Sequence, residues 1–181
     1  MIQNLTATKK ADVTSPYRPG GCKQLHISKQ IIRRNKMNMD RLLASVKKHE
    51  GYRNKVYLDT LGKRTVGVGH LCVEEFWEDN KEYEEKFLMT ILEHDLQTAI
   101  KGAERLCSNC PDIDDLAKEI IIEMVFQLGE TGVSKFKNMW KALEQDPPEY
   151  ATAAMEMLDS RWAKQTPNRA EAMSAEMAGI G

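Results

Sequence analysis

The stretch from Glu50 to His70 constrains this chain more than any other part of the sequence. Glu50 ends an amphipathic segment, and Gly51 behind it is well placed to stop a helix. Asp59 follows nine residues after Glu50, and a Val-Gly-Val-Gly run then leads into His70. A helix end that faces a hairpin can place two acidic side chains on opposite walls of one cleft. The stretch therefore predicts a helix-to-hairpin junction with a carboxyl group on each side.

The residues around this junction predict where its elements begin and end. Asn38 or Asp40 can cap the helix, because short polar side chains accept the free N–H groups of a first helical turn. Segments 55–58 and 64–69 are predicted to form the arms of a β-hairpin that turns at Thr60-Leu61-Gly62.

Two carboxyl groups in unlike surroundings, one protonated and one ionised, are what glycoside hydrolysis usually requires. For a bare pair spaced like Glu50 and Asp59, a solvated helix-end acid and a turn acid are the commoner interpretation. The wider pattern is more specific, because Glu-x8-Asp-x5-Thr followed by Val-Gly-Val-Gly-His-Leu resembles the catalytic signature of the phage-type lysozymes, glycoside hydrolase family twenty-four. Blocks at 124–133 and 160–170 continue the resemblance in the same order, so that it covers about residues 39–175.

This resemblance implies an α+β, predominantly helical fold with two lobes, the phage-lysozyme fold. Residues 39–181 would form the lysozyme catalytic domain. Within it we expect a small hairpin-containing lobe at 39–80, a long connecting helix at 81–108 and a helical lobe at 109–181. Residues 1–38 precede the family pattern and are expected to be an additional, basic N-terminal arm.

Apolar periodicity predicts the helices that follow the hairpin. One is expected over 81–106, and a second apolar stripe over 113–128 is ended by the glycine that comes next. A short helix is indicated at 136–143. A further helix over 146–162 would begin with an Asp-Pro-Pro cap, and a last one would begin at Thr166-Pro167.

The resemblance also implies an activity, hydrolysis of the β-1,4 bond between N-acetylmuramic acid and N-acetylglucosamine in peptidoglycan. Glu50 matches the general acid, Asp59 matches the ionised second carboxylate, and Thr65 matches the residue that helps to hold the attacking water. A water held on the far side of the sugar implies inversion at the anomeric carbon.

Further residues match family positions that contact substrate or support the site. Arg169 would orient Glu50, and a His70–Asp95 pair would tie the hairpin to the long helix. The expected substrate contacts are Leu71, Phe126, Gln127 and Gly129.

The sequence departs from the family pattern at several places. Two other contact positions carry Met139 and Glu156, where relatives have small or amide side chains, so those contacts do not transfer. Only residues 73–80 separate Cys72 from the next predicted helix, where the family has a longer excursion. Trp162 is expected in the core beneath the cleft rather than stacked on sugar.

No cofactor or metal is expected. Cys107-x-x-Cys110 alone could indicate a metal or redox pair, but zinc would need two further ligands at finger spacing, and the sequence has no second pair. Reduced thiols are therefore expected. No apolar run approaches the ~20 residues of a membrane span, no secretory signal is visible at the N-terminus, and no nucleic-acid partner is expected.

Charge is divided unevenly along the chain. Residues 1–39 carry eight Lys and Arg against Asp12 alone, whereas residues 40–181 carry 18 basic and 26 acidic residues. Free phage lysozymes are commonly basic, so an acidic catalytic region with a basic arm favours an enzyme mounted on a phage tail or baseplate over one free in the host cytoplasm before lysis. The arm would then contact a tail or baseplate protein through Tyr17, Leu25, Ile27, Ile31 and Ile32.

Two other functions fit the same fold. A catalytically inactive lysozyme-fold module with a structural or wall-binding role in a virion would have no physical need for Glu50, Asp59 and Thr65 together. A lytic transglycosylase would not need the second carboxylate and would leave an anhydro-sugar end on its product. An active muramidase is therefore the leading prediction.

Overall fold

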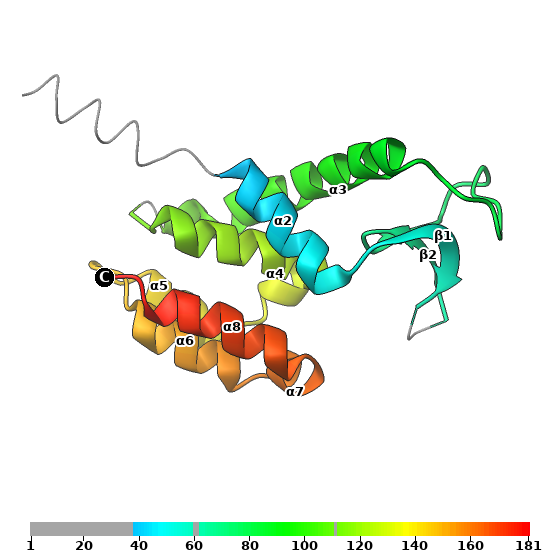
Figure 1. Cartoon of the computed structure of the whole chain (residues 1–181). Helices are drawn as coiled ribbons and strands as arrows, with labels where there is room; N and C mark the ends of the chain where they lie inside the picture. The colour runs from blue at the N-terminus through cyan, green and yellow to red at the C-terminus, as the bar shows by residue number, and fades with distance from the viewer. Residues whose placement is uncertain (1–37, 60–61, 111) are drawn as a thin grey trace, which may run out of the picture. The chain divides into compact units, whose positions relative to one another are not determined.

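The computed structural model describes residues 38–59, 62–110 and 112–181 (Figure 1). These residues are mostly helical and include one small three-stranded antiparallel sheet, which confirms the predicted fold class. In chain order the elements are α2 (Met39–Glu50), β1 (Arg53–Leu58), β2 (Arg64–Gly67), β3 (His70–Leu71), α3 (Glu85–Leu106), the 3-10 turn η1 (Cys107–Asn109), α4 (Asp115–Val133), α5 (Lys137–Leu143), α6 (Tyr150–Leu158), α7 (Arg161–Gln165) and α8 (Pro167–Ala178).

Helix α2 has the predicted start and stop. The side chain of Asn38, rather than that of Asp40, accepts the N–H of Arg41 at 3.0 Å. Gly51 adopts a φ of 74°, a backbone conformation that glycine reaches without steric cost, and its N–H donates to the Lys47 carbonyl at 3.0 Å. Glu50 is therefore the last residue of the helix, at the point where the chain turns into β1 (Figure 1).

The sheet has the order β1-β2-β3, and both of its pairings are antiparallel. Thr65 on β2 lies opposite Tyr57 on β1 and Leu71 on β3, so it occupies the middle of the sheet. The hairpin arms were predicted correctly in place, although β1 begins two residues earlier than expected, at Arg53. Of the predicted turn, residues 60 and 61 lie outside the described part of the chain.

Helix α3 joins two hydrophobic clusters. Leu88 near its start packs with Val66 and Trp77 in the smaller cluster, beside the sheet. Leu92 and Leu96, one and two turns further on, belong to the larger cluster among the helices. One helix thus ties the sheet to the helical core, because burial of apolar side chains at both ends stabilises both attachments.

The predicted start of α3 was wrong by four residues, since the helix begins at Glu85 and not at residue 81. Tyr83 explains the difference. Its backbone N–H donates to the Asn54 carbonyl of β1 at 2.9 Å, and its ring packs edge-on against Trp77 at 5.0 Å between centroids. These contacts, one with β1 and one with Trp77 in the segment after β3, hold the residues before Glu85 in a non-helical conformation.

Helix α4 packs against α3 along the larger cluster and carries a break at the predicted place. Gly129 has a φ of 72° and a ψ of 161°, so the helical run that buries Ile120, Ile121 and Met124 ends there. A short turn then continues to Val133. In the parts of the chain that the structure describes, no helix is both long and apolar enough to cross a membrane.

The predicted helix over 146–162 was wrong at both ends. It begins at Tyr150, so Asp146 does not cap it, and it ends at Leu158. Ser160 separates it from α7, because its hydroxyl donates to the Met157 carbonyl at 2.7 Å and accepts the Ala163 N–H at 3.0 Å. One hydroxyl therefore satisfies the end of α6 and the start of α7 together.

The last helix begins at Pro167, as predicted. Thr166 stands at the cap position but does not accept a helical N–H. Its hydroxyl instead donates to the Trp162 carbonyl at 3.1 Å. Helix α8 packs against α6 and α7 (Figure 1). Its side chains Met173 and Met177 are buried.

Candidate active site

Glu50 meets a buried cation from the helical core. Arg169, on the first turn of α8, donates from Nη1 to Glu50 Oε1 at 2.7 Å. The Arg169 side chain is 9% exposed, and the Glu50 side chain is 23% exposed. The carboxyl group of Glu50 is therefore oriented by α8 while one side of it remains open to solvent.

The turn between β2 and β3 lies against the other carboxylate oxygen. Gly69 has a φ of +78°, and a Cβ added at this position would stand 3.6 Å from Glu50 Oε2 and 3.8 Å from Glu50 Cγ. Glycine is favoured here because the backbone is in the left-handed region, and an added Cβ would be in van der Waals contact with the carboxyl group. Glu50 thus lies between α8 and the turn that precedes His70.

Asp59 and Thr65 share partners on the backbone of Lys63. The Lys63 N–H donates to Asp59 Oδ1 at 2.8 Å. The Lys63 carbonyl accepts the Asp59 N–H at 2.9 Å and the Thr65 hydroxyl at 3.2 Å. Thr65 is 3% exposed. The structure therefore brings these two predicted site residues together at one end of the β1–β2 hairpin.

Tyr57, opposite Thr65 on β1, is a site residue that sequence reasoning missed. Burial is the main cause that raises the pKa of its hydroxyl, and the Arg53 guanidinium, 4.3 Å from the ring centroid, works in the opposite direction. The negative charges of Glu50 and Asp59 add to the rise in this pKa. Tyr57 therefore lies within electrostatic reach of both acids, and its place opposite Thr65 in the hairpin register could have indicated it.

Three of the predicted substrate contacts line one groove of about 470 Å³. Leu71 comes from β3, whereas Phe126 and Gly129 come from α4, so the groove runs between the sheet and the helices. Leu71 is 41% exposed, which leaves its side chain available to a ligand. Sequence reasoning missed an ion pair in the groove wall, in which Arg105 Nη2 of α3 lies 2.6 Å from Glu130 Oε2.

The predicted His70–Asp95 pair forms in the same groove. His70 Nδ1 lies 2.7 Å from Asp95 Oδ2, which joins β3 to α3. This hydrogen bond is the main cause that raises the pKa of His70, although burial opposes it. Glu74 lies 3.6 Å from His70 Nε2 and accepts the Trp77 indole N–H at 2.7 Å, so the residues after β3 add to the network.

Gln127 does not line that groove. It belongs to a smaller pocket of about 320 Å³ whose other walls include His49, Glu50 and Arg169. Its side-chain oxygen accepts the Trp162 indole N–H at 2.7 Å. Trp162 is 3% exposed, in agreement with the prediction of a core residue. Trp162 therefore orients an amide that lies beside the predicted acid.

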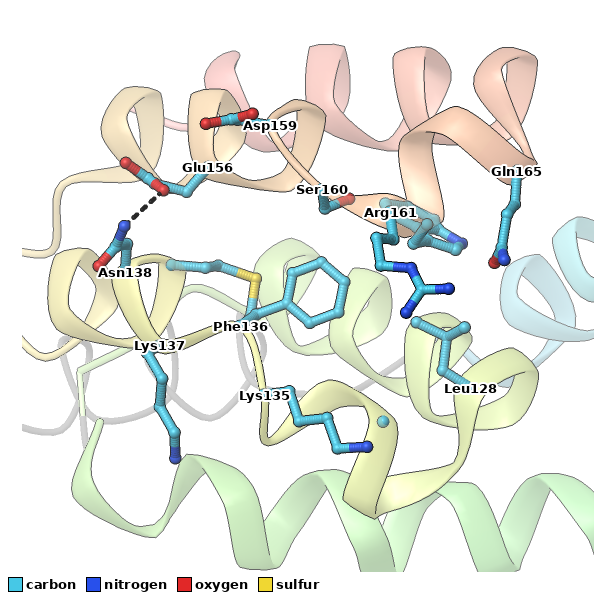
Figure 2. Close-up of a pocket in the computed structure, with 13 residues that line it drawn as sticks. Leu128, Lys135, Phe136, Lys137, Asn138, Glu156, Asp159, Ser160, Arg161 and Gln165 are labelled. Carbon is cyan, nitrogen blue, oxygen red and sulfur yellow. Dashed lines mark hydrogen bonds between the residues drawn. The ribbon is translucent and has the colours of Figure 1, made fainter.

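A third pocket, of about 490 Å³, lies between α5, α6 and α7 (Figure 2). It brings together Met139 and Glu156, the two positions at which family contacts did not transfer. Asn138 donates from Nδ2 to Glu156 Oε2 at 3.0 Å, the bond drawn as a dashed line in Figure 2. The side chain of Glu156 is therefore engaged by its neighbour.

Metal chemistry has no candidate site among residues 38–59, 62–110 and 112–181, which contain no group of three or more His, Cys, Asp and Glu that could hold an ion. Cys107 and Cys110 are free thiols. Burial, and secondarily the neighbouring Cys110, raises the pKa of Cys107 to about 12. Such a thiol is a poor nucleophile at neutral pH.

Comparison with known proteins identifies the family of this chain. The Phage lysozyme family model matches residues 47–175. A protein named Probable T4-type lysozyme 1 from Dictyostelium discoideum is 34% identical over 148 residues, which span 68% of this chain and 85% of that protein. Probable T4-type lysozyme 2 from the same organism is 30% identical over 152 residues, with the same shares of each chain.

A longer relative is the Pre-baseplate central spike protein Gp5 of Enterobacteria phage T4. It is 30% identical over 147 residues, which cover 69% of this chain but 25% of that larger protein. The residues that the family model matches include most of the described helices and strands. By the family model and by these relatives, the chain belongs to the phage lysozyme family and is a lysozyme-like glycoside hydrolase.

Proposed function

We propose that the chain is a muramidase that hydrolyses the β-1,4 bond between N-acetylmuramic acid and N-acetylglucosamine in peptidoglycan, with inversion. The observation that carries this proposal is the placement of Glu50. Its carboxyl group is held at 2.7 Å by Arg169 on one side and bordered by Gly69 on the other, next to a groove between sheet and helices.

The proposed roles follow from these positions. Glu50 donates the proton to the leaving glycosidic oxygen, since its partly open carboxyl group can meet a substrate. The Asp59 carboxylate supports the developing positive charge of the sugar. The Thr65 hydroxyl donates to the Lys63 carbonyl, so its oxygen keeps lone pairs that can accept a hydrogen bond from the attacking water.

The groove of about 470 Å³ is the proposed saccharide site. Leu71 and Phe126 offer apolar surface to sugar rings, and Gly129 lets the backbone of the α4 break approach the ligand. The Gln127 amide, fixed by Trp162, would donate from its nitrogen to a sugar oxygen near Glu50. Asp95 and His70 support the groove by joining β3 to α3.

The test of this function is lysis of purified peptidoglycan by wild-type protein and by Glu50→Gln. The amide keeps the shape of the acid but cannot supply its proton, so the rate is expected to fall by at least about a hundredfold. Glu171→Gln, which changes an exposed acid on α8, is the matched control and is expected to retain the wild-type rate. An active Glu50→Gln protein with a normal circular dichroism spectrum would contradict the proposal.

We further propose that the enzyme is mounted on a phage tail or baseplate through the basic arm, with Tyr17, Leu25, Ile27, Ile31 and Ile32 as contacts. These residues lie outside the described part of the chain. The likeness to Gp5, whose name places it in a baseplate spike, supports this location, as does the split between a basic arm and an acidic remainder. The location is finer than the family assignment and needs its own test.

Deletion of residues 1–37 tests the mounting proposal. The deletion stops there because Asn38 caps α2, and its backbone N–H also donates to Glu119 Oε1 at 3.0 Å. The shortened protein is expected to remain folded and to cut soluble peptidoglycan fragments, but to be missing from purified virions. Loss of folding or of activity on soluble fragments would show that the arm belongs to the catalytic domain instead.

A further inference from the structure

Two buried acids on α4 hold opposite ends of α2. Glu119 and Glu123 are one helical turn apart, and each is 7% exposed. Near the start of α2, Glu119 lies 3.1 Å from Arg41 Nη1. Near its end, Glu123 Oε2 lies 3.1 Å from His49 Nδ1. A buried carboxylate needs a partner, so each acid fixes the part of α2 that it meets.

The second of these ties is adjacent to the proposed acid. His49 directly precedes Glu50, and both residues line the pocket of about 320 Å³. The last carbonyls of a helix lack partners within it, so helix ends fray unless other contacts hold them. Gly51, which follows, has no side chain and would have open space around a Cβ, so it adds no packing at this point.

The two neighbouring residues are held by different helices. The Glu50 side chain is bound by Arg169 from α8, whereas the backbone that carries it is fixed through His49 by Glu123 from α4. Displacement of a reacting group by about 1 Å can cost on the order of a hundredfold in rate. A second anchor one residue from the acid therefore bears on the rate as well as on stability.

We propose that His49 and Glu123 form a positioning pair for Glu50. The proposal rests on the muramidase function proposed above. His49 acts through the end of α2 and touches no substrate, so its loss should lower kcat more than it alters KM. The bond requires only an N–H at the Nδ1 position and an acceptor on α4.

Arg41 provides the matched control. Its pair with Glu119 joins the same two helices at the other end of α2, far along the helix from Glu50. Arg41→Ala and His49→Ala each remove the side chain that pairs with one buried acid on α4. Glu119 keeps the Asn38 N–H at 3.0 Å, and Arg41→Ala also removes an exposed pair with Glu176 of α8. If the His49 pair only adds stability, the two variants should behave alike.

The experiment measures kcat, KM and the thermal midpoint of the full chain on soluble peptidoglycan fragments, each variant well below its own midpoint. His49→Ala is expected to lower kcat about tenfold and to change KM by less than about twofold. His49→Asn, whose amide nitrogen can take the place of Nδ1, is expected to recover most of that loss. Arg41→Ala is expected to lower the midpoint similarly while kcat stays within about twofold of wild type.

A double-mutant cycle tests whether Glu123 is the partner through which His49 acts. Glu123→Ala is expected to reproduce the kcat of His49→Ala, and the double variant to lose no more than either single variant, since all three remove the same contact. Should His49→Ala fail to fold, His49→Leu, which retains the bulk of the ring without a donor, takes its place. The combination His49→Leu with Glu123→Leu removes the unpaired acid as well.

The proposal is overturned if kcat of the His49 variant stays within about twofold of wild type, if Arg41→Ala lowers kcat as much as His49→Ala does, or if the Asn variant recovers nothing. Glu50→Gln is measured in the same assay. If Glu50→Gln is active, the muramidase function itself fails. If it is inactive and the His49 variants match wild type, only the positioning role fails.

Discussion

Arg169 Nη1 donates to Glu50 Oε1 at 2.7 Å, across 119 residues of sequence. This contact joins the first turn of α8 to the last residue of α2. The buried guanidinium fixes where the carboxyl group points, and the carboxyl oxygen in turn accepts a hydrogen bond from that buried group. Site geometry and stability therefore depend on the same pair.

Replacement of Arg169 should affect both the stability of the fold and the orientation of Glu50. Arg169→Leu is expected to lower the free energy of unfolding by about 2–3 kcal/mol, less than for a fully buried pair because Glu50 is partly exposed. It should also lower kcat, because the acid loses its orientation. Arg169→Lys retains the charge without the planar fork and should recover more stability than activity. Urea denaturation and wall-lysis assays check this, and equal recovery of both would contradict the orienting role.

Gly69 should be intolerant of a side chain in a way that reports on Glu50. Gly69→Ala is expected to cost about 1–2 kcal/mol for the left-handed backbone. It should also lower kcat, because the added Cβ would be in van der Waals contact with Glu50 Oε2 at 3.6 Å, so that any shift of the turn to relieve the backbone strain would also move the carboxyl group. Gly62→Ala is the control, because Gly62 has a φ of +75° but no atom within 4 Å of the added carbon. The control should lose comparable stability and keep its activity. Equal activity of the two variants would show that the close approach to Glu50 is unimportant.

The Trp162–Gln127 hydrogen bond should matter for substrate affinity. Trp162→Phe removes the indole donor, which leaves the amide free to turn, and is expected to raise KM about threefold to tenfold with a smaller change in kcat. Trp140→Phe removes a buried indole whose N–H donates to the Val133 carbonyl at 3.0 Å, outside the three pockets. It should reduce the thermal midpoint and leave KM unchanged. A KM for Trp162→Phe equal to that of the control would argue against the proposed sugar contact.

The His70–Asp95 pair should make stability depend on pH in a defined direction. Asp95 raises the pKa of His70 above its ordinary value of 6.5. The protonated pair therefore contributes fully below pH 6.5, the unfolded value, and its contribution is lost as pH rises through the higher folded value.

This contribution is less than about 1 kcal/mol, because both side chains are partly exposed and solvent screens them. The difference in unfolding free energy between wild type and His70→Asn should be larger at about pH 5.5 than at about pH 8.5. Chemical denaturation at the two pH values measures it. A difference that grows with pH would reverse the assignment of the charged pair.

Local patterns predicted much of the fold. The glycines that follow α2 and interrupt α4 were predicted to end helices, and both adopt positive φ there. Predictions failed where a distant contact decided the conformation. The residues before α3 continue a helical pattern in sequence, but Tyr83 binds β1 and Trp77 instead. The hydroxyl of Ser160 divides what periodicity predicts as one helix.

The candidate site, too, was predicted from the sequence only in part. The family resemblance predicted the contacts of Arg169 with Glu50 and of His70 with Asp95, because a family motif implies which distant residues meet in the fold. It did not indicate His49 or Glu123. In the sequence, Glu123 is an acidic residue among the apolar residues of a helix, and nothing near it indicates a partner. That partner, His49, lies 74 residues away. Only the folded chain shows that the two neutralise each other's cost of burial.

The most direct test of the proposed function is the mass of the fragments that the full-length protein releases from purified peptidoglycan. Hydrolysis by a muramidase adds water, so every new reducing end should be an intact N-acetylmuramic acid residue. Glu50→Gln should release none of these fragments. Fragments that end in anhydro-muramic acid, one water lighter, would identify a transglycosylase, and fragments that end in reducing N-acetylglucosamine would place the cut at the other bond. Either result would contradict the proposed muramidase activity.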